Sequence, residues 1–350
     1  MNKFKILVLK IKSLIIPTII CLFTLFLILF SNSNLFAAKK GLSLWANSVV
    51  PSLLPFFIAT ELLGYTNIIS ILGKMLNKLM RPLFNVPGEG AFPFIMGIIS
   101  GYPVGAKIVA DLKRQGLCSN IEAERLIAFT NNSGPLFIIG TIGIGLFKDT
   151  KTGILLLLTH ILACISVGIL FRWWKSGKNK RSSFFIEDSN KLPSKISLLN
   201  LGEVLANSIM NSISTIFLIG GFVVLFSVVI SILNSSGFLE LIANFLSPIL
   251  NIFGLSSKYI NGIVTGLIEL TNGVCSIALI ASKNISTNII ICAFLLGFGG
   301  ISVALQVLSI TSKNGISIKP YLIGKLLQGI FAAFYTYLIL NSFCFLNLDL

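Results

Sequence analysis

The chain has 350 residues, of which 55% are hydrophobic and only 11% are charged, and its formal net charge at pH 7 is +15. A soluble domain carries about 25% charged residues, so this composition excludes an ordinary soluble protein. The apolar stretches run for about 20 residues without the two-residue alternation of a membrane β-barrel. The sequence therefore predicts an all-α polytopic membrane protein in contact with the lipid bilayer.

The first 40 residues are predicted to form an N-terminal transmembrane helix, because a basic start precedes an apolar run from about Leu14 to Phe30. A cleavable signal peptide that ends near "FAA" is the alternative. Further apolar segments are expected at about 44–66, 91–110, 126–147, 152–172, 203–233, 259–281, 288–310 and 320–345. Two stretches of mixed polarity, about 67–86 and 237–255, are predicted to be amphipathic helices along the membrane interface.

The excess of positive charge is interpreted as a signal for membrane topology, because Lys and Arg hold short loops on the cytoplasmic side. The segment 173–200 is predicted to be a basic cytoplasmic linker. This segment contains Lys175, Lys178, Lys180, Arg181, Lys191 and Lys195, and Arg172 lies directly before it. No interleaving of aromatic and basic residues accompanies them, so no nucleic-acid partner is expected.

The two halves of the chain resemble each other, which predicts a duplicated unit in 41–172 and 201–350. "WANSVVPSLLPFFI" at 45–58 is similar to "LANSIMNSISTIFL" at 205–218, and "IAFTNNSGPLFI" at 127–138 is similar to "CAFLLGFGGISV" at 292–303. Two further pairs, "LMRPLFNVPG" with "FLSPILNIFG" and "GIISGYPVGAK" with "GIVTGLIELTN", lie between them in the same order. The first pair is offset by 160 residues and the later pairs by 165 or 166.

The distribution of basic residues predicts that the second repeat is inverted with respect to the first. The N-terminus, the stretch 67–90 and the loop 111–125 are all basic and belong on the cytoplasmic side. Segment 91–110 must then enter and leave the membrane on one face, as a re-entrant hairpin. The same rule makes 259–281 a hairpin that enters from the other face.

Helix-breaking residues interrupt both predicted hairpins and the helix after each of them, at "SGYPVG" (100–105), "TNNSGP" (130–135), "IELTNG" (268–273) and "GFGG" (297–300). An unpaired backbone group in hydrocarbon is costly, so such breaks persist only where protein or a water-filled cavity supplies partners. Inverted repeats with discontinuous helices are typical of secondary transporters, whose half-helix N-termini bind anionic groups. The four breaks therefore predict one central solute site, and helix packing is the alternative for any single glycine.

Lys107 is interpreted as a solute contact or as the partner of Glu61, and Glu269 as a site for a proton, a cation or another side chain. Gln306 is expected to make a helix–helix hydrogen bond. The predicted substrate-binding residues are Ser100, Gly101, Tyr102, Pro103, Gly105, Lys107, Asn131, Asn132, Ser133, Gly134, Glu269, Thr271, Asn272, Gly299 and Gly300.

The sequence indicates no enzyme. The six cysteines are scattered, and the single histidine, His160, is interpreted as a polar residue that faces another helix, with a proton relay as the alternative. No metal-ligand spacing, Ser/His/Asp set, HExxH motif or phosphate-binding loop is found in the sequence. No catalytic residue, metal or cofactor is predicted, and the sequence does not identify a coupling ion.

"SGYPVGAK" and the following "TNNSGPLFIIG" resemble the nucleoside-recognition, or Gate, domain membrane proteins, and more narrowly the sporulation integral membrane proteins of spore-forming Firmicutes. The resemblance extends over about residues 40–345, with more specific motifs in the first half. It implies a fold related to concentrative nucleoside transporters, with two inverted repeats that each carry a hairpin. It also implies importance for the hairpin-tip residues and for Asn131, Asn132, Ser133 and Gly134.

For function, the resemblance implies a transporter that moves dipicolinic acid from the mother cell across the outer forespore membrane during sporulation, with a cytoplasmic N-terminus. Dipicolinate is a planar aromatic dianion, so half-helix N-termini, Lys107 and asparagine amides suit its carboxylates, and Tyr102 suits its ring. Transport of a nucleoside or another organic anion remains an alternative. So does a non-transporting role as a membrane assembly factor. A homo-oligomer is compatible with the sequence.

Overall fold

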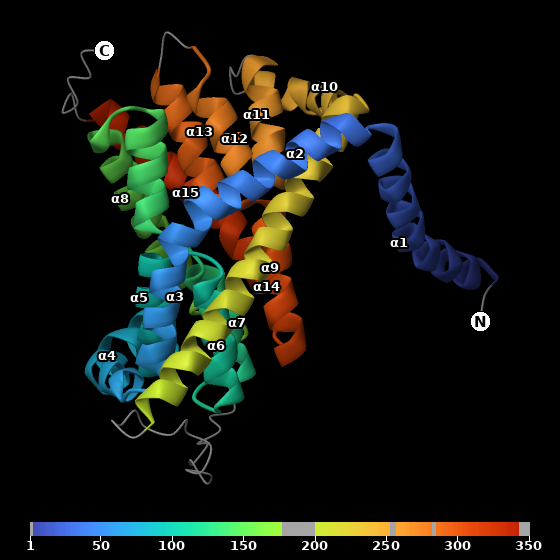
Figure 1. Ribbon diagram of the computed structural model, residues 1–350. Coiled ribbons are helices and arrows are strands. Elements are labelled where there is room, and N and C mark those ends of the chain that lie inside the picture. The colour runs from blue at the N-terminus through green and yellow to red at the C-terminus, as the bar shows by residue number, and fades with distance from the viewer. Residues whose placement is uncertain (1–2, 177–199, 253–256, 282–284, 343–350) are drawn as a thin grey trace.

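The computed structural model describes residues 3–176, 200–252, 257–281 and 285–342, and every regular element in these ranges is a helix (Figure 1). Most of the predicted linker 173–200 lies outside these ranges. In chain order the elements are α1 (Lys3–Leu29), α2 (Ser31–Leu44), η1 (Trp45–Val49), α3 (Val50–Gly64), α4 (Ile68–Phe84), η2 (Gly88–Gly90), α5 (Ala91–Ser100), α6 (Val104–Arg114), α7 (Asn120–Thr130), η3 (Leu136–Leu146), α8 (Thr150–Phe171), α9 (Leu201–Ser235), α10 (Phe238–Ile252), α11 (Ser257–Ile268), α12 (Leu270–Ala278), α13 (Ile285–Phe298), α14 (Gly300–Thr311), η6 (Ser312–Asn314) and α15 (Lys319–Ser342). The segments η1 and η3 are π-helical.

The second half of the molecule repeats the first half upside down, which confirms the predicted all-α fold of two inverted repeats. In Figure 1, α3 runs toward the lower end, where α4 lies, and α9 runs beside it in the opposite direction toward the upper end, where α10 lies. The hairpin α5–α6 belongs to the lower end and the hairpin α11–α12 to the upper end. We call the lower end the basic end, because α4 and the α6–α7 region carry Lys74, Lys78, Arg81, Lys113 and Arg114.

Both predicted re-entrant segments turn back on themselves, which confirms the hairpins. In the first, α5 and α6 pack so closely that a Cβ atom on Gly97 would lie 3.4 Å from the Cα atom of Gly105. In the second, a Cβ atom on Gly273 of α12 would lie 2.0 Å from the Cα atom of Gly266 of α11. Each hairpin therefore needs glycines along its seam, and each tip ends inside the molecule.

Both helices that follow the hairpins are broken, as predicted. The first is interrupted between α7 and η3, and the second is interrupted at Gly299, between α13 and α14. Each hairpin tip packs on the break of its own repeat. A Cβ atom on Gly101 would lie 3.0 Å from the backbone nitrogen of Gly134, and one on Gly300 would lie 3.1 Å from the carbonyl oxygen of Gly266. The close backbone approach explains the glycines of "SGYPVG" and "GFGG".

The N-terminal region differs from the prediction. The sequence predicts one transmembrane helix in the apolar run from about Leu14 to Phe30 and the next from about residue 44, whereas the structure places the helix α2 between them. The chain bends by 99° between α1 and α2, and the side-chain amide of Asn34 donates to the carbonyl oxygen of Phe26 across the bend (3.0 Å). Hydropathy missed α2 because its sequence is largely polar. The helix forms because it packs along α9, with Gly41 against Ser227.

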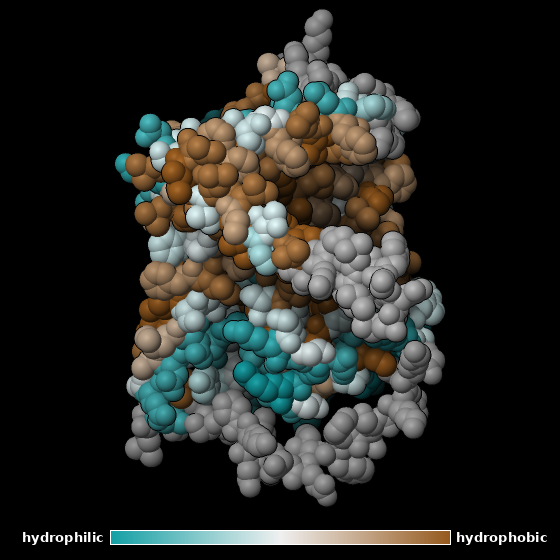
Figure 2. Space-filling model, turned by 90° about the vertical axis from the view of Figure 1, so that its right-hand side faces the viewer, coloured by the Kyte–Doolittle hydropathy of each residue, from teal (hydrophilic) through white to brown (hydrophobic). Residues whose placement is uncertain are grey.

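The outer surface of the helices is apolar, as a membrane requires. On α8, Ile154, Leu158 and Leu162 recur every four residues along one face and are about half exposed, while Leu156 and His160 are buried on another face. Among the described residues, four helices are long and apolar enough to cross a membrane, or up to six if each of two bent pairs counts as one span. Figure 2 shows apolar side chains over the middle of one face and hydrophilic side chains toward the lower end.

The glycine seam of the second hairpin gives a stability prediction. Gly273→Ala is expected to lower the free energy of unfolding by about 1–3 kcal/mol, because the added methyl group has no space against Gly266. Gly221→Ala on α9 is the matched control, since nothing lies within 4 Å of its added Cβ atom. Thermal unfolding of both purified variants in detergent checks the prediction. Equal melting temperatures for the two variants would contradict the hairpin packing.

Candidate functional site

The tips of the two hairpins meet at a cavity of about 400 Å³, which we call the central cavity. Ser100, Gly101 and Tyr102 line it from the α5–α6 tip, and Glu269 and Thr271 line it from the α11–α12 tip. Its volume lies within the range of about 300–1,000 Å³ that is common for small-molecule sites. Two segments from different repeats thus share one cavity large enough for a small organic molecule.

The rest of the wall is mostly apolar, with a few polar groups. Ser302 and Gln306 of α14 line the cavity, and the side-chain oxygen of Gln306 is buried without a hydrogen-bond partner among the described residues. This oxygen therefore does not make the expected helix–helix hydrogen bond with any described residue. The apolar lining from α2, η1, α3 and α9 consists of Leu44, Val49, Pro51, Leu53, Phe56, Ile219 and Val223. An apolar wall with few polar groups is typical of sites for organic molecules.

Glu269 is the only charged residue among the described residues that line the central cavity. Its carboxylate accepts hydrogen bonds from the backbone N–H groups of Thr271 (3.0 Å) and Asn272 (2.8 Å), so it caps the N-terminus of α12. The sequence predicts that such an N-terminus is available to an anionic solute. Here the chain's own carboxylate already accepts from it. The charged group at the second hairpin tip is therefore negative.

Three predicted residues of the first break lie behind the cavity. Asn131, Asn132 and Ser133 are at most 1% exposed and do not line it, whereas Gly134 does. The backbone N–H of Ser133 donates to Nε2 of His160 on α8 (3.3 Å), so His160 faces the break rather than the lipid. These side chains hold the break in shape and position the backbone of Gly134 at the cavity.

Five further predicted residues of the two hairpins and the second break do not line the central cavity. Gly105 packs against the carbonyl oxygen of Thr130, and Pro103 is buried at the turn before α6. Gly299 and Gly300 form the second break, with φ angles of 83° and 82°. Asn272, in the first turn of α12, lines a separate cavity near Lys39 and Lys40.

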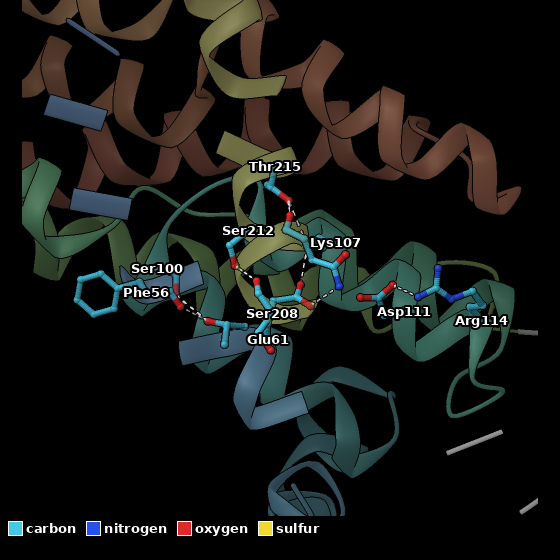
Figure 3. A network of polar contacts seen from close by, with 11 residues as sticks. Phe56, Glu61, Ser100, Lys107, Asp111, Arg114, Ser208, Ser212 and Thr215 are labelled. Carbon is cyan, nitrogen blue, oxygen red and sulfur yellow. Dashed lines mark hydrogen bonds and ion pairs between the residues drawn. The ribbon is translucent and has the colours of Figure 1, made fainter. Parts of the chain in front are cut away.

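Lys107 lines a second cavity of about 490 Å³, which we call the basic-end cavity. Its ammonium group lies 2.5 Å from Oε1 of Glu61 on α3 and donates to the hydroxyl of Thr215 on α9 (3.1 Å). Asn211 of α9 donates to the other carboxylate oxygen of Glu61 (3.2 Å). Figure 3 shows Lys107 pointing between these groups, toward Glu61 and Thr215. Glu61 is thus the partner of Lys107, as one of the two interpretations expected.

A pair of hydroxyl groups lies in the wall between the two cavities. Ser100 lines the central cavity and Thr60 lines the basic-end cavity, and their side-chain oxygens are 3.3 Å apart (Figure 3). Ser100 belongs to the first hairpin and Thr60 to α3. Likewise, Lys107 belongs to the hairpin and its partner Glu61 to α3. Both polar contacts therefore join the first hairpin to the same helix.

Two buried residues of α15 were not predicted from the sequence. Lys325 donates to the backbone carbonyl of Asn131 (3.0 Å), and Gln328 donates to the side-chain oxygen of Asn132 (2.8 Å). The signal was a lone lysine within the apolar run "PYLIGKLLQGIFAAF". Its significance depends on contacts with residues nearly 200 positions earlier, which a pattern along one helix does not reveal.

Comparison with known proteins gives three similarities. A family model described as "Nucleoside recognition" and named Gate matches residues 46–174 and 216–316. The "Sporulation integral membrane protein YlbJ" of Bacillus subtilis (strain 168) is 36% identical over 344 residues, which covers 94% of this chain and 83% of that protein. A solved structure of CNTnw in an outward-facing state has a TM-score of 0.54 at 12% identity, and the match covers 96% of this chain and 88% of that chain.

These similarities agree with the geometry described above. The two matched ranges of the Gate model include both hairpins and both breaks, and the structural similarity to a concentrative nucleoside transporter shows the same fold. The similarity to the sporulation protein extends over nearly the whole chain. The chain therefore belongs to the Gate family of nucleoside-recognition membrane proteins.

Proposed function

We propose that this protein is a membrane transporter that carries a small organic solute by alternating access, with the solute bound in the central cavity. The observation that supports this most is the meeting of two inverted hairpin tips, through Gly101 and Glu269, at one cavity. In a fold of inverted repeats, one repeat rocks or gates against the other around a fixed midplane site. The site then opens to either face of the membrane in turn.

The solute that we favour is dipicolinate, carried from the mother cell across the outer forespore membrane. The name of the sporulation relative supports the setting. The aromatic ring of Tyr102 and the hydroxyls of Thr271 and Ser302 suit a planar ring with carboxylate groups. The positive charge at the basic end, including Lys113 and Arg114, would raise the local concentration of an anion there.

The proposed orientation places the basic end in the cytoplasm, because short basic loops stay on that side. The N-terminus then lies in the cytoplasm as well. In this orientation, the basic-end cavity with Lys107 and Glu61 is the approach to the central cavity from the cytoplasm.

A nucleoside is the second candidate solute, and Glu269 is the observation that favours it. The central cavity contains one carboxylate and no cationic side chain among the described residues that line it. Such a cavity suits a neutral molecule with hydroxyl groups that donate to a carboxylate. The description of the matching family model as "Nucleoside recognition" points to the same class.

Uptake by liposomes that contain the purified protein tests the proposal. Terbium ions inside the vesicles become luminescent when dipicolinate enters, and labelled nucleosides are assayed in parallel. Thr141→Trp is expected to reduce flux at least about tenfold, because the indole fills part of the central cavity. Ile144→Trp is the matched control, since Ile144 is 51% exposed on the same helix. The absence of flux above empty vesicles for every solute and gradient would contradict a transport function.

A further inference from the structure

Lys325 is a buried cation with no carboxylate partner among the residues that the structure describes. It lies on α15 and is only 4% exposed. The ion pairs found among the described residues join Arg81 to Glu122, Lys107 to Glu61, Arg114 to Asp111 and Lys175 to Glu124, and none includes Lys325. A charged group inside a membrane protein is costly, so its retention indicates a function.

The side chain of Lys325 lies beside the breaks of both broken helices. Its ammonium group donates to the backbone carbonyl of Asn131 in the first break (3.0 Å) and to Oε1 of Gln328 (2.8 Å). Its stem lies against the second break, since a Cβ atom on Gly299 would be 3.6 Å from Cε of Lys325. One side chain therefore contacts both interruptions.

Two half-helices end beside this group. The α7 helix ends at Thr130 and α13 ends at Phe298, directly before the residues that Lys325 contacts. A helix C-terminus carries about half a negative charge, and its last carbonyl groups lack partners within the helix. In transporters with discontinuous helices, unwound carbonyls and half-helix C-termini coordinate the coupling cation. Here an ammonium group of the chain makes that contact.

A polar network fixes the position of this ammonium group. Gln328, which accepts from Lys325, donates to Oδ1 of Asn132 (2.8 Å), and its amide nitrogen lies 3.4 Å from Nε2 of His160. His160 precedes Lys325 by 165 residues, which is the offset between the paired segments 127–138 and 292–303. The two residues therefore occupy equivalent positions of the inverted repeats and meet at the breaks.

We propose that the ammonium group of Lys325 is the resident cation of the two broken helices, so that the protein needs no Na⁺ or K⁺ bound at this place. The ammonium group neutralises the carbonyl end of α7 through Asn131, and its stem packs against the break at Gly299, so that one side chain holds the two breaks together. The expected effect of this proposal on flux rests on the proposed transport function. The expected absence of Na⁺ or K⁺ binding beside Lys325 does not.

Thermal unfolding of the protein in detergent tests directly whether the folded protein binds Na⁺ or K⁺. The melting temperature of the unchanged protein is expected to be the same in NaCl, KCl and choline chloride at equal ionic strength. A saturable rise specific to Na⁺ or K⁺ would overturn the proposal, since a ligand that binds only the folded state stabilises it. This measurement needs no variant, so it decides even if substitutions of Lys325 do not fold.

Chemical rescue separates the charge of Lys325 from its packing. Lys325→Ala is expected to melt at a lower temperature and to recover with n-propylammonium chloride but not with 1-propanol, which has the same carbon chain without the charge. Lys325→Arg is expected to keep most of the stability of the unchanged protein. Lys319→Ala, an exposed position on the same helix, is the matched control and should not respond to either compound. Equal rescue by 1-propanol would overturn the proposal.

Liposome flux distinguishes this proposal from the proposed function. Uptake is expected to be equal with Na⁺ and with choline as the external cation. Uptake that requires Na⁺ would overturn the resident-cation proposal and leave the transport function in place. No uptake in either medium, together with a melting temperature that does not depend on Na⁺, would contradict transport and support the resident cation.

Discussion

Glu269→Gln is expected to change the apparent KM for the two candidate solutes in opposite directions. The carboxylate is the one charged group that lines the central cavity among the described residues. At about 6 Å and an effective dielectric constant of about 20, two like unit charges repel by about 3 kcal/mol. Removing the charge should therefore lower the KM for dipicolinate by at least about tenfold. The KM for a nucleoside should rise by at least about tenfold, because a hydrogen bond to a charged group is worth about 1.5–3 kcal/mol.

Two controls accompany this variant. Glutamine accepts less well from the backbone N–H groups of Thr271 and Asn272, and a weakened cap costs about 1 kcal/mol. Flux is therefore normalised to the folded fraction, which is measured by thermal unfolding. Glu240→Gln, on the exposed surface of α10, is expected to leave both KM values unchanged. An unchanged KM for both solutes in Glu269→Gln would contradict binding in the central cavity.

Glu61→Ala is expected to destabilise the protein more than the double substitution Glu61→Ala/Lys107→Ala. The ammonium group of Lys107 is partly buried, and the loss of Glu61 leaves it with the hydroxyl of Thr215 alone among the described contacts. A coupling free energy of about 1–3 kcal/mol is expected from the double-mutant cycle, measured by thermal unfolding. Because the pair joins the first hairpin to α3, flux should fall about tenfold in Glu61→Ala and recover in part in the double variant.

The exposed ion pair of Arg114 with Asp111 provides the matched comparison. It lines the same basic-end cavity, but the Arg114 side chain is 70% exposed. Asp111→Ala is expected to cost less than about 1 kcal/mol. Additive effects of Glu61→Ala and Lys107→Ala would contradict the coupled pair. A higher KM in Lys107→Ala without a change in melting temperature would instead place Lys107 in contact with the solute.

The hairpins and breaks could be predicted from sequence because each has a strong local cause. Gly101 requires a backbone with φ of +85°, and Gly105 approaches the carbonyl oxygen of Thr130, so the residue types mark the conformation. The positive-inside rule then supplied the direction of each hairpin. These signals lie within short segments, which a single sequence can show.

The composition of the cavity could not be predicted in the same way. Lys107 and Gly101 are six positions apart, yet α6 carries Lys107 away from the hairpin tip to Glu61 in the basic-end cavity. Ser302 and Gln306 enter the central cavity because α14 packs beside the second hairpin. Such placements depend on how distant helices pack, and local spacing does not contain that information.

Labelling of single cysteines tests most directly whether the two hairpins enter the membrane from opposite faces. In a chain whose six native cysteines are replaced by alanine, cysteine is introduced at Lys78 and Gln115 for the first hairpin and at Ser236 and Leu279 for the second, all of which are exposed. A membrane-impermeant maleimide is then added to right-side-out and inverted vesicles. Positions 78 and 115 are expected to react from one face of the membrane and positions 236 and 279 from the other. Reaction of position 115 from the face opposite to position 78 would show that 91–114 crosses the membrane, and it would contradict the re-entrant hairpins.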